Sequence, residues 1–470
     1  MSDIPPSADV VICGAGMTGI CTAYFLTKMG IRDILLVDRR SPLTLTSDKS
    51  AETYCNWWPD ETMFRFAQRS LEIMEELARQ TGNAFNLNRR GECYIATSLQ
   101  KAAEFQHMAQ QFAHLGLGPV RVHHGDNGDR RPYVPSAATG FTGVPAGSDL
   151  LLDQGSIREH FPYVSPKATA VLHARSCGWF SAHTLGMLLL EQAKKNGVRE
   201  VRANFEGVEQ DKAGVCAVQV RGQDGTDRIH TRCFVNAAGP FVKQVAAMLG
   251  VELPVRTGLW EKFVFKDHLG VIPRSAPTLI LKDELFLEWS EEEKAILTQE
   301  DDSRWLLNKF ASGPYLRPEG GQDSQWVLMG WAYNEPPYKV HRRRDEKRVG
   351  AGVVCEPQWD PRYTRDFPEI VLRGMASLIE GLKQYLHKMP RPMQDGGYYV
   401  QTKDVVGETF REENPPLIGP LGPQGAFIVN VCHGVSMGCA AGELCAAWLT
   451  GNRLPEYAGE LSLQRYYDTR

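Results

Sequence analysis

The first forty residues alternate short apolar runs with a glycine-rich turn. Residues 9–13 predict a β-strand, the run that ends at residue 29 predicts a helix, and residues 34–37 predict a second strand. The turn, over residues 14–19, lies between the first strand and the helix. This order is typical of a βαβ unit that binds a dinucleotide, and the acidic residue 38 follows the second strand as such a unit requires.

Later segments predict a return to this first unit and then a second kind of sheet. Further strands of the first unit are expected over residues 197–202, 216–220, 228–235 and 426–430. Between about residues 246 and 395, aromatic-rich segments such as 260–266 and 326–333 alternate with a period of two, which is typical of an antiparallel sheet. A helix of small residues that continues through Trp448 is predicted after the last strand.

We therefore predict an α/β protein with a Rossmann-like nucleotide-binding domain and a mostly antiparallel β-sheet substrate domain flanked by helices. The nucleotide-binding domain is expected to be discontinuous, because its predicted elements are separated in the sequence. It comprises residues 1–88, 166–245 and 396–470, and the predicted substrate domain comprises residues 89–165 and 246–395.

The composition is that of a soluble globular protein with roughly two or three domains. The chain has 470 residues, of which 43% are hydrophobic and 23% are charged, and its formal net charge is -4. No long run of one charge sign occurs, and the densest cluster, residues 341–348, mixes both signs. Nucleic-acid binding is therefore not expected.

Targeting signals and metal-binding motifs are not evident. The apolar stretch over residues 10–26 has no preceding basic segment, so we do not interpret it as a signal peptide. The apolar run at 429–449 is broken by His433 and Glu443, so no membrane span is expected. The 11 cysteines include no C-x-x-C pair, which favours reduced thiols over disulfides or a zinc site. We expect a cytoplasmic protein without a metal.

Each glycine of the turn has a physical role in binding a dinucleotide. Gly14 permits the tight turn, Gly16 lets the backbone approach a pyrophosphate, and Gly19 allows the helix to pack closely. The N-terminus of the following helix offers free N–H groups and a positive dipole to the phosphates. Asp38 is placed to accept hydrogen bonds from ribose hydroxyls.

The wider pattern resembles a known family. The glycines of the turn are followed by Ala23, Leu26 and Gly30, and the pattern closes on Asp38-Arg39, which resembles the FAD-binding start of the D-amino-acid oxidase superfamily. Other segments that resemble blocks of this family are Thr46-Ser47-x-x-Ser50, Phe234 to Gly239, Leu316 to Glu319, Cys432-His-Gly434 and Gly442-Glu443. The resemblance extends over nearly the whole chain.

The resemblance implies a flavoenzyme that oxidises a carbon–nitrogen bond, close to the sarcosine, dimethylglycine and glycine oxidases. Such an enzyme transfers a hydride from a secondary or cyclic amine, or an amino acid derivative, to N5 of FAD, and O2 or another acceptor then takes the electrons. Only one strong nucleotide fingerprint is present, so no separate NAD(P)H site is expected. The expected FAD contacts are Gly14, Ala15, Gly16, Met17, Thr18, Gly19, Asp38, Arg39, Thr46, Ser47, Ser50, Val208, Ala238, Gly239, His433, Gly434, Val435 and Ser436.

Four residues are candidates for the substrate site. The resemblance places Trp331 and Tyr399 over the flavin, where aromatic rings could shape an apolar pocket or cage a cation, or else pack in the core. Arg317 could bind an anionic group bidentately or form a structural salt bridge. His433 could act as a base, or as an orienting contact at the start of a helix whose N–H groups stabilise reduced flavin.

The chain also departs from the family pattern. Sarcosine-type enzymes carry a lysine that clamps the substrate carboxylate where this chain has Ser436, which argues against a simple sarcosine-like substrate. Related oxidases carry a lysine that promotes the reaction with oxygen where this chain has Leu328 or Met329. The positions that family members use for covalent flavin attachment lack the usual Cys or His, so non-covalent FAD is expected, with Cys55 as the one residue that could form a link.

Two other functions are compatible with the same motifs. A flavoenzyme that oxidises a 2-hydroxy acid or another alcohol would need a base such as His433 for the hydroxyl proton. A non-catalytic FAD-binding assembly factor could keep the fold without turnover, with the departures at Ser436 and Leu328 as its support.

Overall fold

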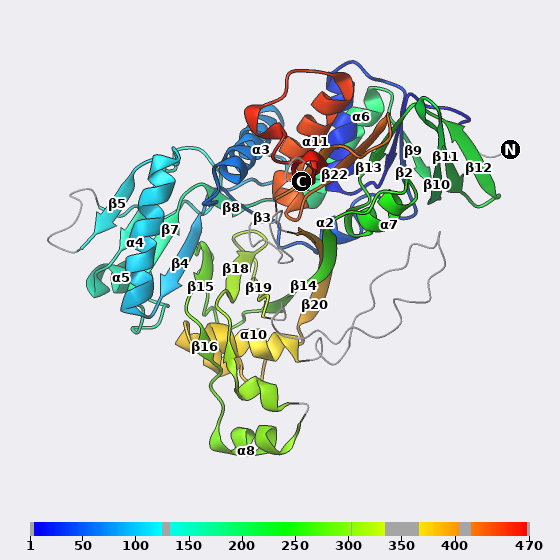
Figure 1. Ribbon diagram of the computed structural model, residues 1–470. Helices are drawn as coiled ribbons and strands as arrows, with labels where there is room; N and C mark the ends of the chain where they lie inside the picture. Colours follow the sequence, from blue (N-terminus) through cyan, green and yellow to red (C-terminus); the bar gives the residue numbers. More distant parts are fainter. Residues whose placement is uncertain (1–3, 125–131, 302, 334–365, 404–414, 468–470) are drawn as a thin grey trace.

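Two large sheets and the helices that cover them make up most of the structure (Figure 1). The computed structural model describes residues 4–124, 132–301, 303–333, 366–403 and 415–467. The mixed charge cluster at 341–348 lies outside the described residues.

The first sheet contains the N-terminal βαβ unit. Its six strands run in the order β21-β22-β13-β1-β2-β9, and every neighbouring pair is parallel except β21 with β22. The strands are β1 (Val10–Cys13), β2 (Ile34–Asp38), β9 (Arg199–Arg202), β13 (Cys233–Asn236), β21 (Leu417–Pro420) and β22 (Ala426–Asn430). The predicted order of strand, turn, helix and strand is confirmed, with helix α1 at Met17–Lys28.

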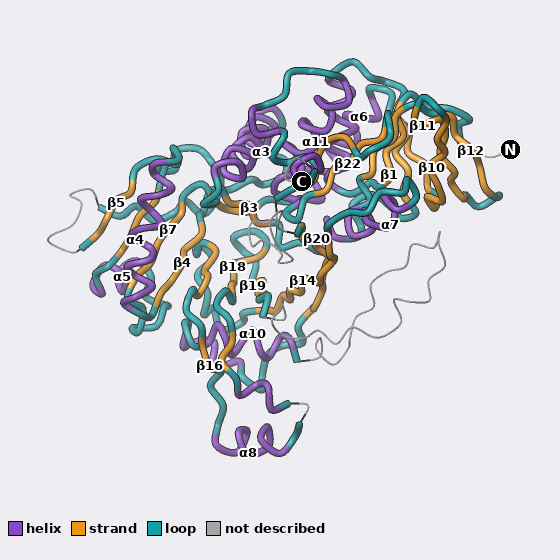
Figure 2. Tube along the Cα trace, viewed as in Figure 1, coloured by secondary structure: helices purple, strands orange, loops and turns teal. Residues whose placement is uncertain are grey.

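Helices pack on this sheet through small residues. Helix α11 (Gly434–Thr450) lies against α1, and a Cβ atom at Gly442 would lie 2.4 Å from the carbonyl carbon of Cys21, so only glycine allows this approach. Figure 2 shows α11 beside α3 (Glu61–Gln80), and α6 (Ala182–Lys195) packs on the other side of α1. The predicted helix of small residues is therefore confirmed.

Smaller elements complete this part of the molecule. A three-stranded antiparallel sheet is built from β10 (Asn204–Asp211), β11 (Gly214–Arg221) and β12 (Thr226–His230). The other short elements are α2 (Thr46–Lys49), β3 (Thr53–Cys55), α5 (Gln154–His160), β8 (Cys177–Trp179), α7 (Val242–Ala247), β16 (Leu285–Phe286), α8 (Glu291–Gln299) and β17 (Lys309–Phe310).

The second large sheet has nine strands in the order β20-β14-β19-β18-β15-β4-β7-β6-β5. It is mostly antiparallel, as predicted, and only the pairs β15–β4 and β5–β6 are parallel. The strands are β4 (Glu92–Ala96), β5 (Val120–His123), β6 (Ser148–Leu151), β7 (Ala170–Ala174), β14 (Val255–Lys266), β15 (Thr278–Leu281), β18 (Tyr315–Glu319), β19 (Trp326–Gly330) and β20 (Met393–Thr402). Helices α4 (Leu99–His114) and α10 (Phe367–Ala376) cover it.

The strands of the second sheet alternate between an apolar core and a cavity. Cys93 and Ile95 on β4 and Leu279 on β15 are fully buried in the core, together with Leu316 and Met329 of the neighbouring strands. The residues between them point to the opposite face, because successive side chains of a strand alternate. This opposite face forms one wall of the large cavity described below.

The sheets divide the chain differently from the predicted domain boundaries in two places. Strand β7 lies in the segment 166–245 and most of β20 lies in 396–470, both of which the sequence assigned to the nucleotide-binding domain. In the structure β7 pairs with β4 and β6, and β20 pairs with β14 along ten consecutive residues. Pairing with partners distant in the sequence, which local patterns do not reveal, places both strands in the nine-stranded sheet.

Candidate active site

A large cavity of about 1230 Å³ lies between the two sheets. Its walls include the carboxyl ends of β1 and β2, the start of α11, the strand β20, and one face of β4, β15 and β18. Ligands of open parallel sheets bind outside the carboxyl ends of the strands. The volume exceeds that of a usual small-molecule pocket, which is about 300–1,000 Å³, so it can hold a dinucleotide together with a substrate.

The glycine turn adopts a shape that side chains would prevent. Gly14 has φ +115°, and a Cβ atom there would lie 2.3 Å from the carbonyl oxygen of Ala237. A Cβ at Gly19 would lie 1.9 Å from the carbonyl oxygen of Gly14. The turn therefore needs glycine at both positions for contacts within the protein itself.

Gly16 is different, because no contact within the protein forces it to be glycine. A Cβ atom there would meet nothing closer than Ser47 Oγ, at 3.5 Å, and Gly16 lines the cavity. At Gly239 a Cβ would meet nothing within 4 Å, and at Gly434 the nearest atom would be 3.6 Å away. All three glycines thus leave free volume on the cavity side, as the close approach of a pyrophosphate to the backbone requires.

Asp38 connects the end of β2 to the glycine turn. Its Oδ2 accepts a hydrogen bond from the backbone N–H of Ala15 at 2.8 Å, and its Oδ1 accepts one from the N–H of Arg40 at 2.9 Å. These bonds fix the carboxylate at the cavity wall. Each carboxylate oxygen has a second lone pair, which can accept a ribose hydroxyl.

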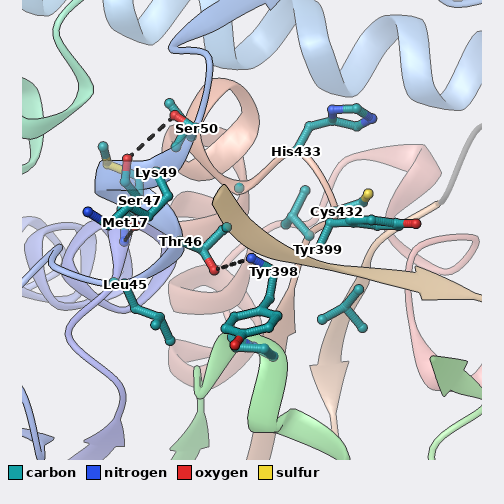
Figure 3. Close-up of a pocket in the computed structure, with 18 of the residues that line it drawn as sticks. Met17, Leu45, Thr46, Ser47, Lys49, Ser50, Tyr398, Tyr399, Cys432 and His433 are labelled. Atoms are coloured by element: carbon teal, nitrogen blue, oxygen red, sulfur yellow. Dashed lines mark hydrogen bonds between the residues drawn. The ribbon is translucent and has the colours of Figure 1, made fainter. Parts of the chain in front are cut away.

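Two hydrogen bonds connect helix α2 to its neighbours in the cavity wall, α1 and β20. Ser47 Oγ accepts a hydrogen bond from the N–H of Met17 at 3.0 Å, which connects α2 to the start of α1. Thr46 Oγ1 accepts one from the N–H of Tyr398 at 3.2 Å, which connects α2 to β20 (Figure 3). The predicted contacts Thr46, Ser47 and Ser50 all line the cavity.

Helix α11 points its N-terminus at the same space. His433, Gly434, Val435 and Ser436 line the cavity, and the first N–H groups of a helix have no acceptor within the helix. The His433 ring packs edge-on against Trp58, with ring centres 5.2 Å apart, and the surrounding protein lowers the pKa of His433 to about 4. The imidazole is therefore neutral at pH 7 and is a weak proton acceptor.

Arg317 is fully buried and contacts protein groups. Its guanidinium donates to the carbonyl oxygen of Ala51 at 3.1 and 2.8 Å, pairs with Glu319 at 2.7 Å, and lies 5.1 Å from the Trp179 ring centre. It does not line the cavity. The structural salt bridge is thus the interpretation that the geometry supports, and binding of an anionic substrate group by Arg317 is not supported.

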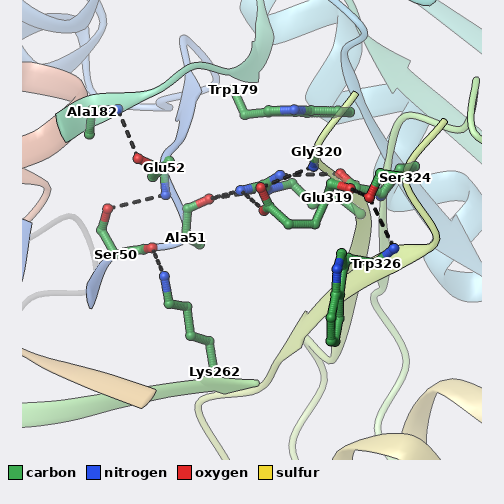
Figure 4. Close-up of polar contacts among 12 residues, drawn as sticks. Ser50, Ala51, Glu52, Trp179, Ala182, Lys262, Glu319, Gly320, Ser324 and Trp326 are labelled. Carbon is green, nitrogen blue, oxygen red and sulfur yellow. Dashed lines mark hydrogen bonds and ion pairs between the residues drawn. The ribbon is translucent and has the colours of Figure 1, made fainter. Parts of the chain in front are cut away.

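Lys262, on β14, lies on the same face of the nine-stranded sheet as Arg317. It pairs in register with Gly330 of β19. Its Nζ donates to the carbonyl oxygen of Ser50, and burial lowers its pKa. Figure 4 shows Lys262 below Ser50 and Glu52. Sequence reasoning did not select this residue, because the contact depends on a loop that lies far away in the sequence.

The two aromatic candidates have different positions. Trp331 is 2% exposed, packs against Phe310 and Tyr333, and does not line the cavity, so it is a core residue. Tyr399 lines the cavity, and its ring covers Gly258, where a Cβ would lie 2.3 Å from the tyrosine oxygen.

A short aromatic wall continues from Tyr399. The Trp260 ring meets Tyr399 edge-on at 6.0 Å between ring centres, and Trp260 Nε1 donates to the Tyr315 hydroxyl at 3.3 Å. The Tyr315 ring lies over Gly330, where a Cβ would come within 2.4 Å of its oxygen. Beyond Tyr315 the wall carries Glu92, Tyr94, Thr278 and Lys282, which sequence reasoning missed.

Most of the predicted FAD contacts gather around this one cavity. The predicted residues that line it are Gly14, Gly16, Met17, Thr18, Asp38, Arg39, Thr46, Ser47, Ser50, Ala238, Gly239, Tyr399, His433, Gly434, Val435 and Ser436. Ala15 and Gly19 do not line the cavity. The N–H of Ala15 donates to Asp38, and Gly19 packs against the carbonyl group of Gly14. Val208 lies on β10 away from the cavity, and Phe205 and Glu206 on the same strand line it instead, because the strand turns its beginning toward the nucleotide end.

Cys55 also lines the cavity, on the short strand β3. It pairs in register with Cys177 of β8, and burial, together with the neighbouring Cys55 thiol, raises the pKa of Cys177 well above its usual value. Within the described residues, no three His, Cys, Asp or Glu side chains are grouped closely enough to hold a metal ion. Among those same residues, no helix combines the length and the hydrophobicity that crossing a bilayer requires.

This arrangement defines a dinucleotide-binding site at the carboxyl ends of the parallel strands, with the nine-stranded sheet forming the opposite wall of the cavity. The family model described as "DAO: FAD dependent oxidoreductase" matches residues 9–448, so the chain belongs to this family. FAD is therefore the cofactor, and the free volume at Gly16, Gly239 and Gly434 fits it. The resemblance inferred from the sequence is confirmed.

Curated relatives and solved structures agree with this assignment. Mitochondrial dimethylglycine dehydrogenase of Rattus norvegicus is 25% identical over 329 residues, which cover 69% of this chain and 33% of that protein. Mitochondrial sarcosine dehydrogenase of Homo sapiens is 26% identical over 257 residues, which cover 54% of this chain and 25% of that protein. The chain thus spans a third or less of the length of these relatives.

Two crystal structures show the same fold over almost the whole chain. L-proline dehydrogenase from P. horikoshii has a TM-score of 0.68 at 16% identity and covers 99% of both chains. Glycine oxidase from Geobacillus kaustophilus has a TM-score of 0.67 at 16% identity and covers 98% of this chain and 99% of its own. At this identity the likeness establishes the fold.

Proposed function

We propose that this protein oxidises an amine or an amino acid at a carbon–nitrogen bond, with FAD as the electron acceptor. The observation that carries the proposal is the large cavity, which is lined both by the glycine turn and Asp38 and by a set of aromatic and charged residues. Family membership and relatives named as dimethylglycine, sarcosine and proline dehydrogenases support the choice of a carbon–nitrogen bond.

The residues of the chain divide the work between the two ends of the cavity. The turn at 14–19 and Asp38 hold the nucleotide half of FAD, and FAD, when bound, supplies the acceptor for a hydride. The N–H groups at the start of α11 stabilise negative charge beside them. Tyr399, Trp260 and Tyr315 exclude water from the substrate end, which strengthens electrostatic interactions there.

We further propose that FAD is bound without a covalent link. Cys55 is the one candidate for a link that the sequence offers, and in the structure it pairs with Cys177 across strands β3 and β8. Acid precipitation of the purified protein should leave the yellow colour in the supernatant, whereas a yellow pellet would contradict this part of the proposal. Cys55→Ser should then bind FAD as the wild type does.

We also propose a cytoplasmic location. Ten cysteines of the described chain are free, as expected for a reducing compartment. The curated relatives are named mitochondrial, so fractionation of cells that express the natural protein would decide between the two compartments.

The test is an anaerobic titration of the purified yellow protein with amines, amino acids and 2-hydroxy acids. We expect at least one amine or amino acid to bleach the flavin absorbance, and hydroxy acids to leave it unchanged. Bleaching by hydroxy acids alone would instead establish an alcohol oxidoreductase. A flavin that dithionite reduces but no compound bleaches would point to the non-catalytic assembly factor. Recovery of the colour in air would identify O2 as an acceptor.

A further inference from the structure

Two cysteines face each other at the wall of the cavity, and the proposed oxidation of an amine uses neither of them. Cys55 of β3 pairs in register with Cys177 of β8 in a short antiparallel ribbon, and both thiols are free. Cys55 is half-buried and lines the cavity, whereas Cys177 is fully buried and does not line it. The ribbon therefore holds one thiol that the cavity reaches and a second thiol beside it.

The hydrogen-bond pattern of the ribbon brings the two cysteine side chains close together. The N–H of Asn56 donates to the carbonyl oxygen of Ser176 at 3.1 Å. Since hydrogen-bonded and non-hydrogen-bonded pairs alternate along an antiparallel ribbon, the preceding pair of Cys55 with Cys177 is non-hydrogen-bonded. In agreement, the Cys177 carbonyl oxygen accepts a hydrogen bond from outside the ribbon, from the N–H of Gly91 at 2.9 Å. Side chains of a non-hydrogen-bonded pair lie closer to each other than those of the other kind.

The spacing of such a pair matches that of a disulfide. The Cα atoms of a non-hydrogen-bonded pair are about 4.5 Å apart, and disulfides span Cα separations of about 4.4–6.8 Å. Burial, together with the neighbouring Cys55 thiol, raises the pKa of Cys177 well above its usual value, which agrees with two sulfur atoms side by side. Closure of a disulfide between them therefore needs little movement of the backbone.

The ribbon of β3 and β8 joins the two walls of the cavity. Strand β3 follows α2 and packs on α11, and both helices contribute predicted FAD contacts. Strand β8 follows β7 of the nine-stranded sheet, and the N–H of Gly91, which Cys177 accepts, lies directly before β4 of the same sheet. Figure 1 shows β3 and β8 between α3 and this sheet. A covalent bond within the ribbon would thus connect the FAD-binding wall to the opposite wall.

A further contact connects Cys55 to the start of α11. Trp58 Nε1 donates to the carbonyl oxygen of Cys55 at 3.2 Å. The Trp58 ring in turn packs edge-on against His433, directly before α11, with ring centres 5.2 Å apart. The wall around Cys55 is therefore continuous with the helix end that we assign to the cofactor.

We propose that Cys55 and Cys177 are a peroxide-sensitive pair, which hydrogen peroxide entering the cavity converts into a disulfide. The Cys55 thiolate attacks one oxygen of the peroxide, the O–O bond breaks, and a sulfenic acid forms as hydroxide leaves and takes up the proton lost from the thiol. The Cys177 sulfur then attacks the Cys55 sulfur, the S–O bond breaks, and the leaving hydroxide takes the Cys177 proton to form water. The two thiols lose two electrons, and the peroxide gains them.

The disulfide is reversible and changes how the cavity holds its cofactor. Two molecules of a small thiol reopen it by exchange and leave as their own disulfide. In a compartment that keeps thiols reduced, the pair is therefore open until peroxide accumulates. While the disulfide is closed, the two walls cannot separate at the ribbon, so FAD leaves the cavity more slowly. No step requires an amine, so this inference goes beyond the proposed function and does not rest on it.

A second pair of adjacent thiols in the same chain provides an internal control. Cys21 of α1 and Cys439 of α11 are 0% and 1% exposed, and neither lines the cavity. The neighbouring Cys439 thiol, together with burial, raises the pKa of Cys21 well above its usual value. This pair is thus similar in composition and burial, but peroxide in the cavity does not reach it. We expect it to stay reduced.

The experiment follows the thiols of the reduced holoprotein during exposure to a small excess of hydrogen peroxide, with no amine present. Catalase ends the reaction, and free thiols are counted by a chromogenic reagent after unfolding in urea. Digestion without reductant, followed by mass spectrometry, identifies which cysteines are joined. Release of FAD from the reduced and the oxidised protein is measured by the rise in flavin fluorescence.

Two variants remove a member of the pair, and two others are controls. Cys55→Ser removes the thiol at the cavity, and Cys177→Ala removes the buried one. Cys432→Ser removes another cysteine that lines the cavity, and Cys439→Ser removes a member of the buried second pair. Urea denaturation verifies that each variant is folded. If Cys177→Ala is not, the peptide map of the wild type and the Cys55→Ser variant decide.

We expect the free thiols of the wild type to fall from eleven to nine, with Cys55 joined to Cys177, and dithiothreitol to restore all eleven. Cys55→Ser should keep its remaining thiols, and Cys177→Ala should stop at a sulfenic acid on Cys55, which dimedone labels. Cys432→Ser and Cys439→Ser should form the same disulfide as the wild type. FAD release from the oxidised wild type should be slower by about threefold or more, and peroxide should leave the rate in Cys55→Ser unchanged.

The inference is overturned if Cys55 and Cys177 remain thiols, if either is joined to another cysteine instead, or if the disulfide forms without slowing FAD release. A link between Cys21 and Cys439 that forms equally fast would contradict the importance of access from the cavity. Because no amine takes part, a failure of amines to bleach the flavin would count against the proposed function alone.

Discussion

Replacement of Asp38 by alanine tests whether the nucleotide end of the cavity works as the structure suggests. The Asp38 carboxylate receives hydrogen bonds from the N–H groups of Ala15 and Arg40, so it stabilises the glycine turn before any ligand arrives. It also lines the cavity where the ribose of FAD would lie. Asp38→Ala removes all of these interactions at once.

The expected magnitude follows from the kind of hydrogen bond involved. A hydrogen bond to a charged group contributes about 1.5–3 kcal/mol, and Asp38 is only partly buried, so water replaces part of each lost bond. We expect the apoprotein to lose about 2–4 kcal/mol of unfolding free energy. Loss of the ribose contact should weaken FAD binding about 10- to 100-fold, since each factor of ten corresponds to about 1.4 kcal/mol.

The assay measures FAD dissociation by the rise in flavin fluorescence, and stability by urea denaturation. Asp38→Asn keeps one acceptor oxygen and should give intermediate values. Asp33→Ala removes an exposed carboxylate that pairs with Arg199 on the surface, and it should behave as the wild type. A folded Asp38→Ala protein that retains FAD with unchanged affinity would refute the role assigned to this residue.

Three further predictions concern the rest of the fold. Gly16→Val should abolish FAD binding with little loss of apoprotein stability, because the nearest atom to a Cβ at residue 16 lies 3.5 Å away. Gly19→Ala should unfold the protein, because a Cβ at residue 19 would lie 1.9 Å from the carbonyl oxygen of Gly14. Denaturation of the two apoproteins and their FAD content after purification measure these effects. Asp149→Ala should lower the free energy of unfolding by about 3–5 kcal/mol, because it leaves the buried Arg175, which pairs with Asp149 at 2.6 Å, without its anionic partner. Thermal unfolding of the variant and the wild type measures this loss. Burial lowers the pKa of His173 to about 3, so its contribution to stability is complete above about pH 6.5 and declines as the pH falls toward 3; urea denaturation at several pH values should show a smaller decline in His173→Gln.

The sequence predicted the nucleotide end of the site well, because its signals are local. Three glycines, two strands and Asp38 follow one another within forty residues, and the pattern corresponds directly to the turn, α1 and β2. The start of α11 was also predicted, from the His-Gly pair that precedes a run of small residues. Backbone geometry at these positions depends little on distant parts of the chain.

The substrate end could not be predicted in the same way, because it is assembled from segments far apart in the sequence. Glu92 and Thr278 are neighbours only through the parallel pairing of β4 with β15. Arg317 belongs to a segment that resembles a family block, but its guanidinium donates hydrogen bonds to the carbonyl oxygen of Ala51 in a distant loop. Trp331 is buried in the core. One signal was present, since Glu92 and Tyr94 occupy alternate positions of the otherwise apolar strand β4, which indicates a second face.

The most direct test of the central claim is the stoichiometry of a single turnover. The oxidised holoprotein is mixed anaerobically with an excess of the compound that bleaches it best, and reduced flavin and released product are quantified together. The account predicts that each reduced flavin is accompanied by one oxidised amine, recovered as an imine or its hydrolysed carbonyl product. Bleaching without any oxidised amine, or oxidised amine formed while the flavin stays oxidised, would contradict FAD-linked oxidation of a carbon–nitrogen bond in this cavity.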